Sequence, residues 1–309
     1  MTRVWVPYPD WPDRLDLPPG TVVDVHDGTG EVPAGIEEVD FYVVPYMSGP
    51  ELSRLMAQMP SLKVAQSLSA GVETIRPLVP DGVTLCNARG VHDASTAELA
   101  VALLLASLRG LPENVRAAER GEWAPEQRQS LADRRVLIVG YGAVGAAVEA
   151  RLAGFECEVR RVARRSRPAG GEGPEVASME ALTDLLPWAE VVVLTVPLTE
   201  ATRGLVDAKF LAAMPDGSLL VNVARGQVVV TDDLVAETGS GRLRAALDVT
   251  DPEPLPVDHP LWTTPGVLVV PHVGGATSAF LPRALRLVQE QLARFLAGRP
   301  LHNVITGDY

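Results

Sequence analysis

The sequence predicts an α/β protein with two parallel sheets, each covered by helices on both faces. Short β-rich runs alternate with polar or helical stretches and recur about every twenty residues, which is the spacing of βα units. Between two series of such runs, residues 93–109 are apolar on nearly every side and predict a long buried helix. A closing helix is expected over 281–296, and Gly298 suits its carboxyl-terminal cap.

The predicted strands form two series. The first comprises 4–6, 21–26, 41–46, 64–68 and 83–86, and the second comprises 135–139, 158–162, 191–196, 218–223, 245–249 and 267–270. The closing helix would naturally return to the first series, so the second domain is interpreted as an insertion. We therefore expect one domain over 1–92 and 279–309 and another over 93–278, with an irregular loop at 168–174.

Length and composition favour a globular protein without a membrane span. The 309 residues suit about two domains, and the apolar fraction of 47% provides a sizeable core. No uncharged apolar run reaches the roughly 18 residues of a membrane span, and residues 1–5 begin as a strand rather than as a signal peptide. The net charge of −12 disfavours nucleic acid or an anionic membrane as a partner.

The two cysteines are too few for a disulfide framework. Cys86 and Cys157 also lack the spacing of metal ligands, and both lie in or beside apolar runs. We therefore expect two small buried side chains, no metal site and a cytoplasmic location.

A glycine-rich loop follows the first strand of the second series. Its residues Gly140, Gly142, Ala143, Val144 and Gly145 fit the G-x-G-x-x-G pattern between a strand and a helix. Glycines there permit a tight turn and a close approach of the backbone to a pyrophosphate, whose charge lies at a helix N-terminus. The loop predicts a dinucleotide site, and the alternative is a glycine-rich structural turn.

The end of the next strand indicates which dinucleotide binds. An acid there would hold the ribose hydroxyls of NAD, but the sequence continues as Ala163, Arg164, Arg165 and Ser166. Guanidinium groups bind phosphate through paired hydrogen bonds, so this segment favours NADP, with NAD still possible. The alternative is a solvated loop in a protein whose cations are nearly all arginines.

Three further segments end strands of the second series, where open α/β sheets place their ligands. They carry Arg225, then Asp248 with Glu253, and finally His272. Taken singly, each residue has an ordinary explanation, because a histidine after a strand or an arginine–glutamate pair is often structural. Their order along three consecutive strand ends favours a catalytic group.

These segments resemble the D-isomer-specific 2-hydroxyacid dehydrogenase family over essentially the whole chain. The matching motifs are Ser95-Thr96-Ala97-Glu98, Gly121-Glu122-Trp123, the Gly140 loop, Val196-Pro197-Leu198-Thr199, the Arg225 segment, Glu253-Pro254 and Pro271-His272-Val273-Gly274-Gly275. The resemblance implies a Rossmann-type cofactor domain inserted in a flavodoxin-like substrate domain. It also implies an oxidoreductase that interconverts a small 2-oxo acid and its D-2-hydroxy acid.

The resemblance assigns roles that the chemistry supports. His272 would be the acid in reduction and the base in oxidation, and Glu253 would orient its ring and favour the imidazolium. Arg225 would bind the substrate carboxylate and polarise the carbonyl. The expected further contacts are Ser69, Ala70 and Gly71 with the substrate carboxylate, Asp248 with the nicotinamide carboxamide, Val223 and Ala224 with the nicotinamide ring, and Thr96, Pro197 and Gly274 with the cofactor.

Within the family, glyoxylate and hydroxypyruvate are the preferred substrates. Formate dehydrogenases carry glutamine where Glu253 stands, phosphite dehydrogenases carry lysine near Ala70, and phosphoglycerate dehydrogenases commonly append a regulatory domain. Trp262 is interpreted either as a wall of the substrate pocket or as a subunit contact. A homodimer is expected through 93–109, including Ala102 and Leu105. The alternative function is a dinucleotide-sensing scaffold that binds protein partners.

Overall fold

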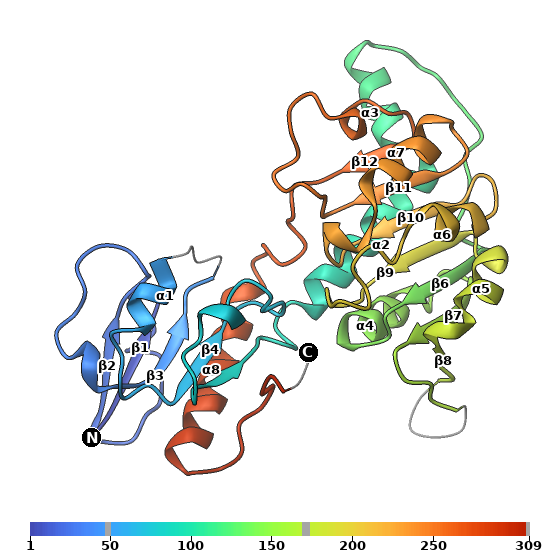
Figure 1. The fold of residues 1–309 in the computed structure, drawn as a ribbon. Coiled ribbons are helices and arrows are strands. Elements are labelled where there is room, and N and C mark those ends of the chain that lie inside the picture. Colours follow the sequence, from blue (N-terminus) through green and yellow to red (C-terminus); the bar gives the residue numbers. More distant parts are fainter. Residues whose placement is uncertain (47–50, 169–173, 307–309) are drawn as a thin grey trace. The chain divides into compact units, whose positions relative to one another are not determined.

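The computed structural model describes residues 1–46, 51–168 and 174–306, so most of the loop expected at 168–174 lies outside the described residues. The chain divides into two compact units, Met1–His92 with Ser278–Tyr309, and Asp93–Thr277. Each unit contains one parallel sheet, and Figure 1 labels most of the strands of both. The prediction of two parallel α/β domains is confirmed.

The first unit has a five-stranded sheet in the order β2-β1-β3-β4-β5, which is the flavodoxin-like order. Its strands are β1 (Thr2–Val6), β2 (Thr21–Val25), β3 (Val39–Val44), β4 (Val64–Ser67) and β5 (Thr84–Cys86). Alternate side chains of β1 and β3 enter two cores. One core packs against α8 (Phe280–Leu296) and the other against α1 (Glu51–Met56). Gly298 has a φ of 63° just beyond α8, the conformation expected of a cap glycine.

The second unit has a seven-stranded parallel sheet in the order β12-β11-β10-β9-β6-β7-β8. Its strands are β6 (Arg135–Val139), β7 (Glu158–Ala163), β8 (Ala177–Ser178), β9 (Val191–Leu194), β10 (Leu219–Asn222), β11 (Arg244–Leu247) and β12 (Val267–Val269). The strand order reverses direction at β6, which lies between β7 and β9. Ligands of doubly wound sheets bind at the carboxyl ends of the strands at such a switch point.

Helices cover both faces of this second sheet. The helices are α2 (Asp93–Arg109), α3 (Leu111–Glu119), α4 (Ala143–Leu152), α5 (Leu182–Leu185), α6 (Ala208–Ala213) and α7 (Thr231–Gly239). Helices α2 and α4 share one core with the sheet, and α5, α6 and α7 share the other. Among the described residues, no single helix is long and apolar enough to span a membrane. Only α2 and α3 taken together pass that test, and they meet at an angle of 64°.

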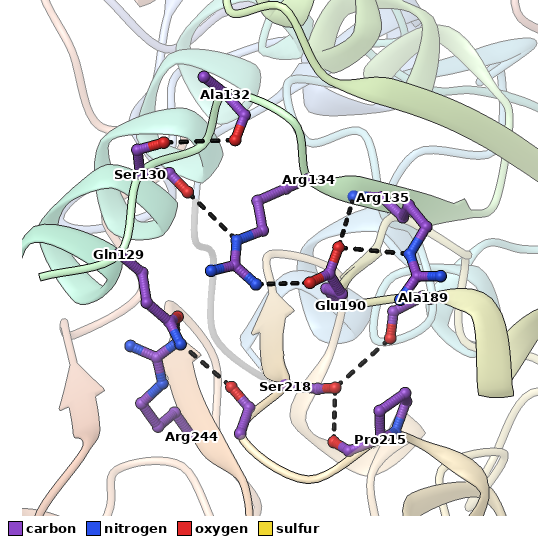
Figure 2. Close-up of polar contacts among 11 residues, drawn as sticks. Gln129, Ser130, Ala132, Arg134, Arg135, Ala189, Glu190, Pro215, Ser218 and Arg244 are labelled. Carbon is purple, nitrogen blue, oxygen red and sulfur yellow. Dashed lines mark hydrogen bonds and ion pairs between the residues drawn. The ribbon is translucent and has the colours of Figure 1, made fainter.

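Hydrogen bonds and ion pairs from charged side chains connect the amino-terminal ends of several strands of this sheet (Figure 2). Glu190, just before β9, accepts from the Arg134 guanidinium at 2.5 Å and from the Arg135 backbone amide at 3.2 Å. Arg244, at the start of β11, donates to the side-chain oxygen of Gln129. Burial raises the pKa of Glu190, but the bonds from both arginines more than offset it, so the pKa lies below its ordinary value.

Glu190→Gln is expected to destabilise the protein at neutral pH by about 1–2 kcal/mol, because the amide keeps the shape but loses a charge-assisted bond. A carboxylate with a lowered pKa stabilises the fold at neutral pH, and this contribution is lost as pH falls through that pKa. The difference in melting temperature between parent and variant should therefore disappear in acid. Glu180→Gln, at an exposed position, is the matched control. Equal effects of the two substitutions would contradict the role assigned to Glu190.

Candidate active site

The glycine loop lies at the switch point, between β6 and α4. Gly140 has a φ of 102°, and a Cβ there would lie 2.6 Å from the Val196 backbone nitrogen. A Cβ on Gly145 would lie 2.3 Å from the Gly140 carbonyl oxygen. Both positions therefore require glycine. A Cβ on Gly142 would face open space, which leaves room for the backbone to approach a ligand.

The glycine loop leads directly into the N-terminus of α4, which is where a dinucleotide phosphate binds in such folds. Ala143 and Val144 form the first turn of α4, whose unsatisfied backbone amides favour an anion. The Thr195 hydroxyl, just after β9, donates to the Gly140 carbonyl and fixes the turn. Sequence reasoning missed Thr195, although a hydroxyl that directly follows an apolar strand was a visible signal. The residues therefore fit a dinucleotide phosphate.

The arginine cluster at the end of β7 divides into two groups. Arg160 is paired with Glu158 and lies over the Trp188 ring, and Arg161 is paired with Glu149 of α4. Arg164, Arg165 and Ser166 follow β7 and are exposed. Neither Arg164 nor Arg165 forms an ion pair with any residue that the structure describes. Their guanidinium groups are therefore the ones available to an external phosphate.

His272 and Glu253 form a hydrogen-bonded pair beyond the carboxyl ends of β12 and β11. The Nδ1 of His272 lies 2.5 Å from Oε1 of Glu253, and the two side chains are 35% and 41% exposed. A carboxylate only accepts, so Nδ1 carries the hydrogen and Nε2 remains for a reacting group. His272 has a φ of 51°, an uncommon conformation for a residue other than glycine. Such positive φ values cluster at functional sites.

The buried Asp248 forms hydrogen bonds with the backbone of the segment that carries His272. It is 3% exposed, and its two oxygens accept from the backbone amides of Val273 at 2.7 Å and Gly274 at 3.1 Å. Burial raises the pKa of Asp248, and these two bonds act in the opposite direction. The backbone amide of His272 also donates to the Asp248 carbonyl at 2.8 Å. Asp248 thus has a structural role that the sequence did not reveal, and its expected contact with the carboxamide stays a prediction.

Arg225 follows β10 in a segment that Asn222 organises. The Asn222 side chain donates to the Arg225 carbonyl and accepts from the Ala224 amide, both at 3.0 Å. Val223 and Ala224 are buried, and the Arg225 guanidinium donates to the Ala224 carbonyl at 2.7 Å. Sequence reasoning gave Asn222 no role, although a buried amide at the end of an apolar strand is a recognisable signal.

The remaining predicted contacts lie on other elements. Thr96 is half-buried in the first turn of α2, and Pro197 is exposed after β9. Ser69, Ala70 and Gly71 follow β4 in the first unit and are half-buried. The Asn87 side chain donates to the Ala70 carbonyl at 2.8 Å, and the Ala88 amide donates to the Ser69 carbonyl at 2.9 Å.

Trp262 is partly exposed, and its indole nitrogen donates to the Pro256 carbonyl at 2.8 Å. Both interpretations of Trp262 stay predictions. Among the described residues, no three His, Cys, Asp or Glu side chains group in a way that could hold a metal ion.

Comparison with known proteins identifies the family. The sequence model of the D-isomer specific 2-hydroxyacid dehydrogenase NAD binding domain matches residues 101–274. The chain belongs to this family. Human glyoxylate reductase/hydroxypyruvate reductase is 33% identical over 250 residues, which is 78% of this chain and 76% of the human protein. The expected family and enzyme class are thereby confirmed.

Two solved structures share the architecture. A D-isomer specific 2-hydroxyacid dehydrogenase from Xanthobacter autotrophicus Py2, in complex with NADPH and MES, is 32% identical with a TM-score of 0.83. An NADPH-dependent glyoxylate/hydroxypyruvate reductase from Sinorhizobium meliloti, in complex with NADP and sulfate, is 28% identical with a TM-score of 0.83. Each alignment covers 99% of this chain and 98% of the other chain. This protein is thus a dehydrogenase with a nicotinamide dinucleotide-binding domain.

Proposed function

We propose that the protein reduces a small 2-oxo acid, glyoxylate or hydroxypyruvate, to its D-2-hydroxy acid with NADPH. The observation that carries the reaction type is the His272–Glu253 pair beyond the carboxyl ends of β12 and β11, with Arg225 after the neighbouring β10. The substrate is supported by the relatives named glyoxylate/hydroxypyruvate reductase. We also propose that the first unit binds substrate, including through Ser69, Ala70 and Gly71.

When bound, the nicotinamide supplies the hydride that the 2-oxo carbon accepts. The oxygen then develops negative charge and needs a proton, which His272 donates from Nε2. Glu253 holds the opposite ring nitrogen and stabilises the imidazolium before transfer. Arg225 binds the substrate carboxylate through paired bonds and polarises the neighbouring carbonyl.

The experiment that tests this function is a screen of 2-oxo acids with NADPH and NADH, followed by loss of the reduced-cofactor absorbance. Glyoxylate or hydroxypyruvate should give the highest kcat/KM, and NADPH should be preferred. Turnover confined to larger 2-oxo acids would contradict the substrate, and a preference for NADH would contradict the cofactor.

Arg164→Asp should shift the preference from NADPH towards NADH. Loss of one charge-assisted phosphate contact, together with repulsion from the new carboxylate, should raise the KM for NADPH about 10- to 100-fold. The effect should appear chiefly in KM, because the 2'-phosphate is remote from the reacting carbon. Arg160→Asp is the matched control, since Arg160 is paired with Glu158. Equal effects of the two substitutions would contradict a phosphate contact by Arg164.

Glu253→Gln tests the pairing of Glu253 with His272. The amide keeps the shape and can still hydrogen-bond to the His272 ring, but it loses the negative charge beside that ring, so kcat/KM for reduction should fall by less than in His272→Asn. The dissociation constant for NADPH should stay the same. An unchanged kcat/KM would show that Glu253 does not act through His272.

We also propose a homodimer formed around α2 and α3. Most apolar side chains of α2 pack in the core of their own unit. The apolar composition of α2 is therefore explained by burial within the unit and gives less support for a dimer interface than the sequence suggested. The support comes instead from exposed apolar side chains beside it, Leu111, Val115 and Trp123, the last 95% exposed. Light scattering should give a dimer mass, and a monomer mass at all concentrations would contradict this.

A cytoplasmic location is proposed with the same function. Cys86 and Cys157 are both free thiols, the state that a reducing compartment maintains. The net charge of −12 supports a small-molecule substrate rather than nucleic acid or an anionic membrane.

A further inference from the structure

Tyr141 occupies the first variable position of the glycine loop, and two arginines lie against its ring. The guanidinium carbons of Arg161 and Arg167 lie 5.9 Å and 5.3 Å from the ring centroid. The Tyr141 hydroxyl donates to Glu149, which also accepts two bonds from Arg161. The ring is therefore fixed on α4 and β7 by its hydroxyl, and its carbon framework is left to contact Arg167.

Arg167 is attached to its surroundings in two further ways. Its guanidinium donates to the Tyr141 carbonyl at 2.9 Å. Its backbone exchanges two hydrogen bonds with Val176, each of 2.9 Å, in an antiparallel bridge. Arg167 therefore joins the chain beyond β7 to the glycine loop through a side-chain hydrogen bond, a ring contact and a backbone bridge.

The segment Arg164-Arg165-Ser166 lies between two fixed points. On one side, Ala163 ends β7 and pairs with Ser178 of β8. On the other side, Arg167 is held by Tyr141 and Val176. Three exposed residues between two anchors have fewer conformations available than a free loop. The backbone bridge to Val176 holds one end of this segment beside β8, and the Arg167–Tyr141 contact is what ties that end to the glycine loop.

We infer that Arg167 and Tyr141 are positioning residues for the 2'-phosphate of NADPH, acting by holding Arg164-Arg165-Ser166 beside the glycine loop. This inference rests on the proposed use of NADPH. Tyr141 carries no charge and its hydroxyl is used by Glu149, so its ring contributes through Arg167 and not through a phosphate contact. Holding a cationic segment in place before binding reduces the ordering cost that the phosphate contact must overcome.

The test is a double-mutant cycle of Arg167→Gln and Tyr141→Leu, with KM and kcat measured for NADPH and NADH. Each single substitution should raise the KM for NADPH about 5- to 10-fold, by loss of the ring contact and the ordering it provides. The KM for NADH and both kcat values should change less than about twofold. Because the Tyr141 ring acts through Arg167, whose hydrogen bond to the Tyr141 carbonyl survives in Tyr141→Leu, the double variant should resemble Arg167→Gln rather than multiply the two effects.

Two further variants distinguish a positioning role of Arg167 and Tyr141 from a general effect of positive charge near the loop and from a general loss of stability. Arg160→Gln removes one cation from the same strand without touching the loop and should leave the NADPH KM unchanged. Tyr141→Phe keeps the ring beside Arg167 but loses the hydrogen bond to Glu149, so its KM for NADPH should lie between those of the parent and Tyr141→Leu. A KM as high as that of Tyr141→Leu would contradict a role of the ring contact.

The cofactor proposal and this inference fail in different ways. A parent that prefers NADH overturns both. A parent that prefers NADPH, combined with multiplicative effects in the double variant or equal losses with NADH, overturns only the positioning role. Multiplicative effects would mean that Arg167 and Tyr141 act independently, as expected if Arg167 itself contacts the phosphate.

Discussion

His272→Asn is expected to lower the turnover of 2-oxo acid reduction by about 100- to 10,000-fold, the usual contribution of a positioned general acid. Asparagine preserves a hydrogen bond to Glu253 and tolerates the positive φ of this position, so the backbone should be undisturbed. The loss should fall on kcat, because proton donation occurs only as the alkoxide develops. Turnover is measured with saturating cofactor, and cofactor binding separately by fluorescence.

Cofactor affinity is the internal control for this variant. The glycine loop lies on β6 and α4, away from β12 in the strand order, so the dissociation constant for NADPH should stay within about twofold of the parent. Unchanged turnover would remove His272 from the mechanism. Lost turnover together with lost cofactor binding would indicate a disturbed fold.

Arg225→Met is expected to lower kcat/KM for 2-oxo acids by about 100- to 1,000-fold, because a substrate carboxylate would lose its charged partner. Methionine keeps an unbranched side chain of similar length and removes only the guanidinium. The matched control is Arg203→Met, an exposed arginine that donates to Gln227 in the same region of the sheet edge. If Arg203→Met cost as much as Arg225→Met, Arg225 would not be the carboxylate anchor.

The strands were predictable because apolar runs at regular spacing follow directly from burial on both faces of a parallel sheet. Helix α2 also has the predicted bounds. Several shorter elements had no predicted bounds, among them α1, α3, α5, α6, α7 and β8. β8 has only two residues, too few to show a period, and it forms by pairing with β7. Helix α3 contains no buried residue, so it lacks the buried apolar face from which α2 was predicted.

The site was predictable at its strand ends but not in its supporting contacts. The His272–Glu253 contact was expected and is present at 2.5 Å. The division of the arginine cluster could not be foreseen, because it depends on Glu149 of α4 and on the Tyr141 ring. Pairings between separate elements are set by packing, which a local pattern does not contain.

The most direct test of the proposed reaction is the rate of glyoxylate and hydroxypyruvate reduction with NADPH and NADH, compared between the parent and His272→Asn. The parent is expected to reduce these acids rapidly with NADPH to the hydroxy acid, D-glycerate in the case of hydroxypyruvate, and the variant should lose at least about 100-fold of this rate. A parent that binds NADPH yet turns over neither acid, or a variant as active as the parent, would contradict the proposed reaction.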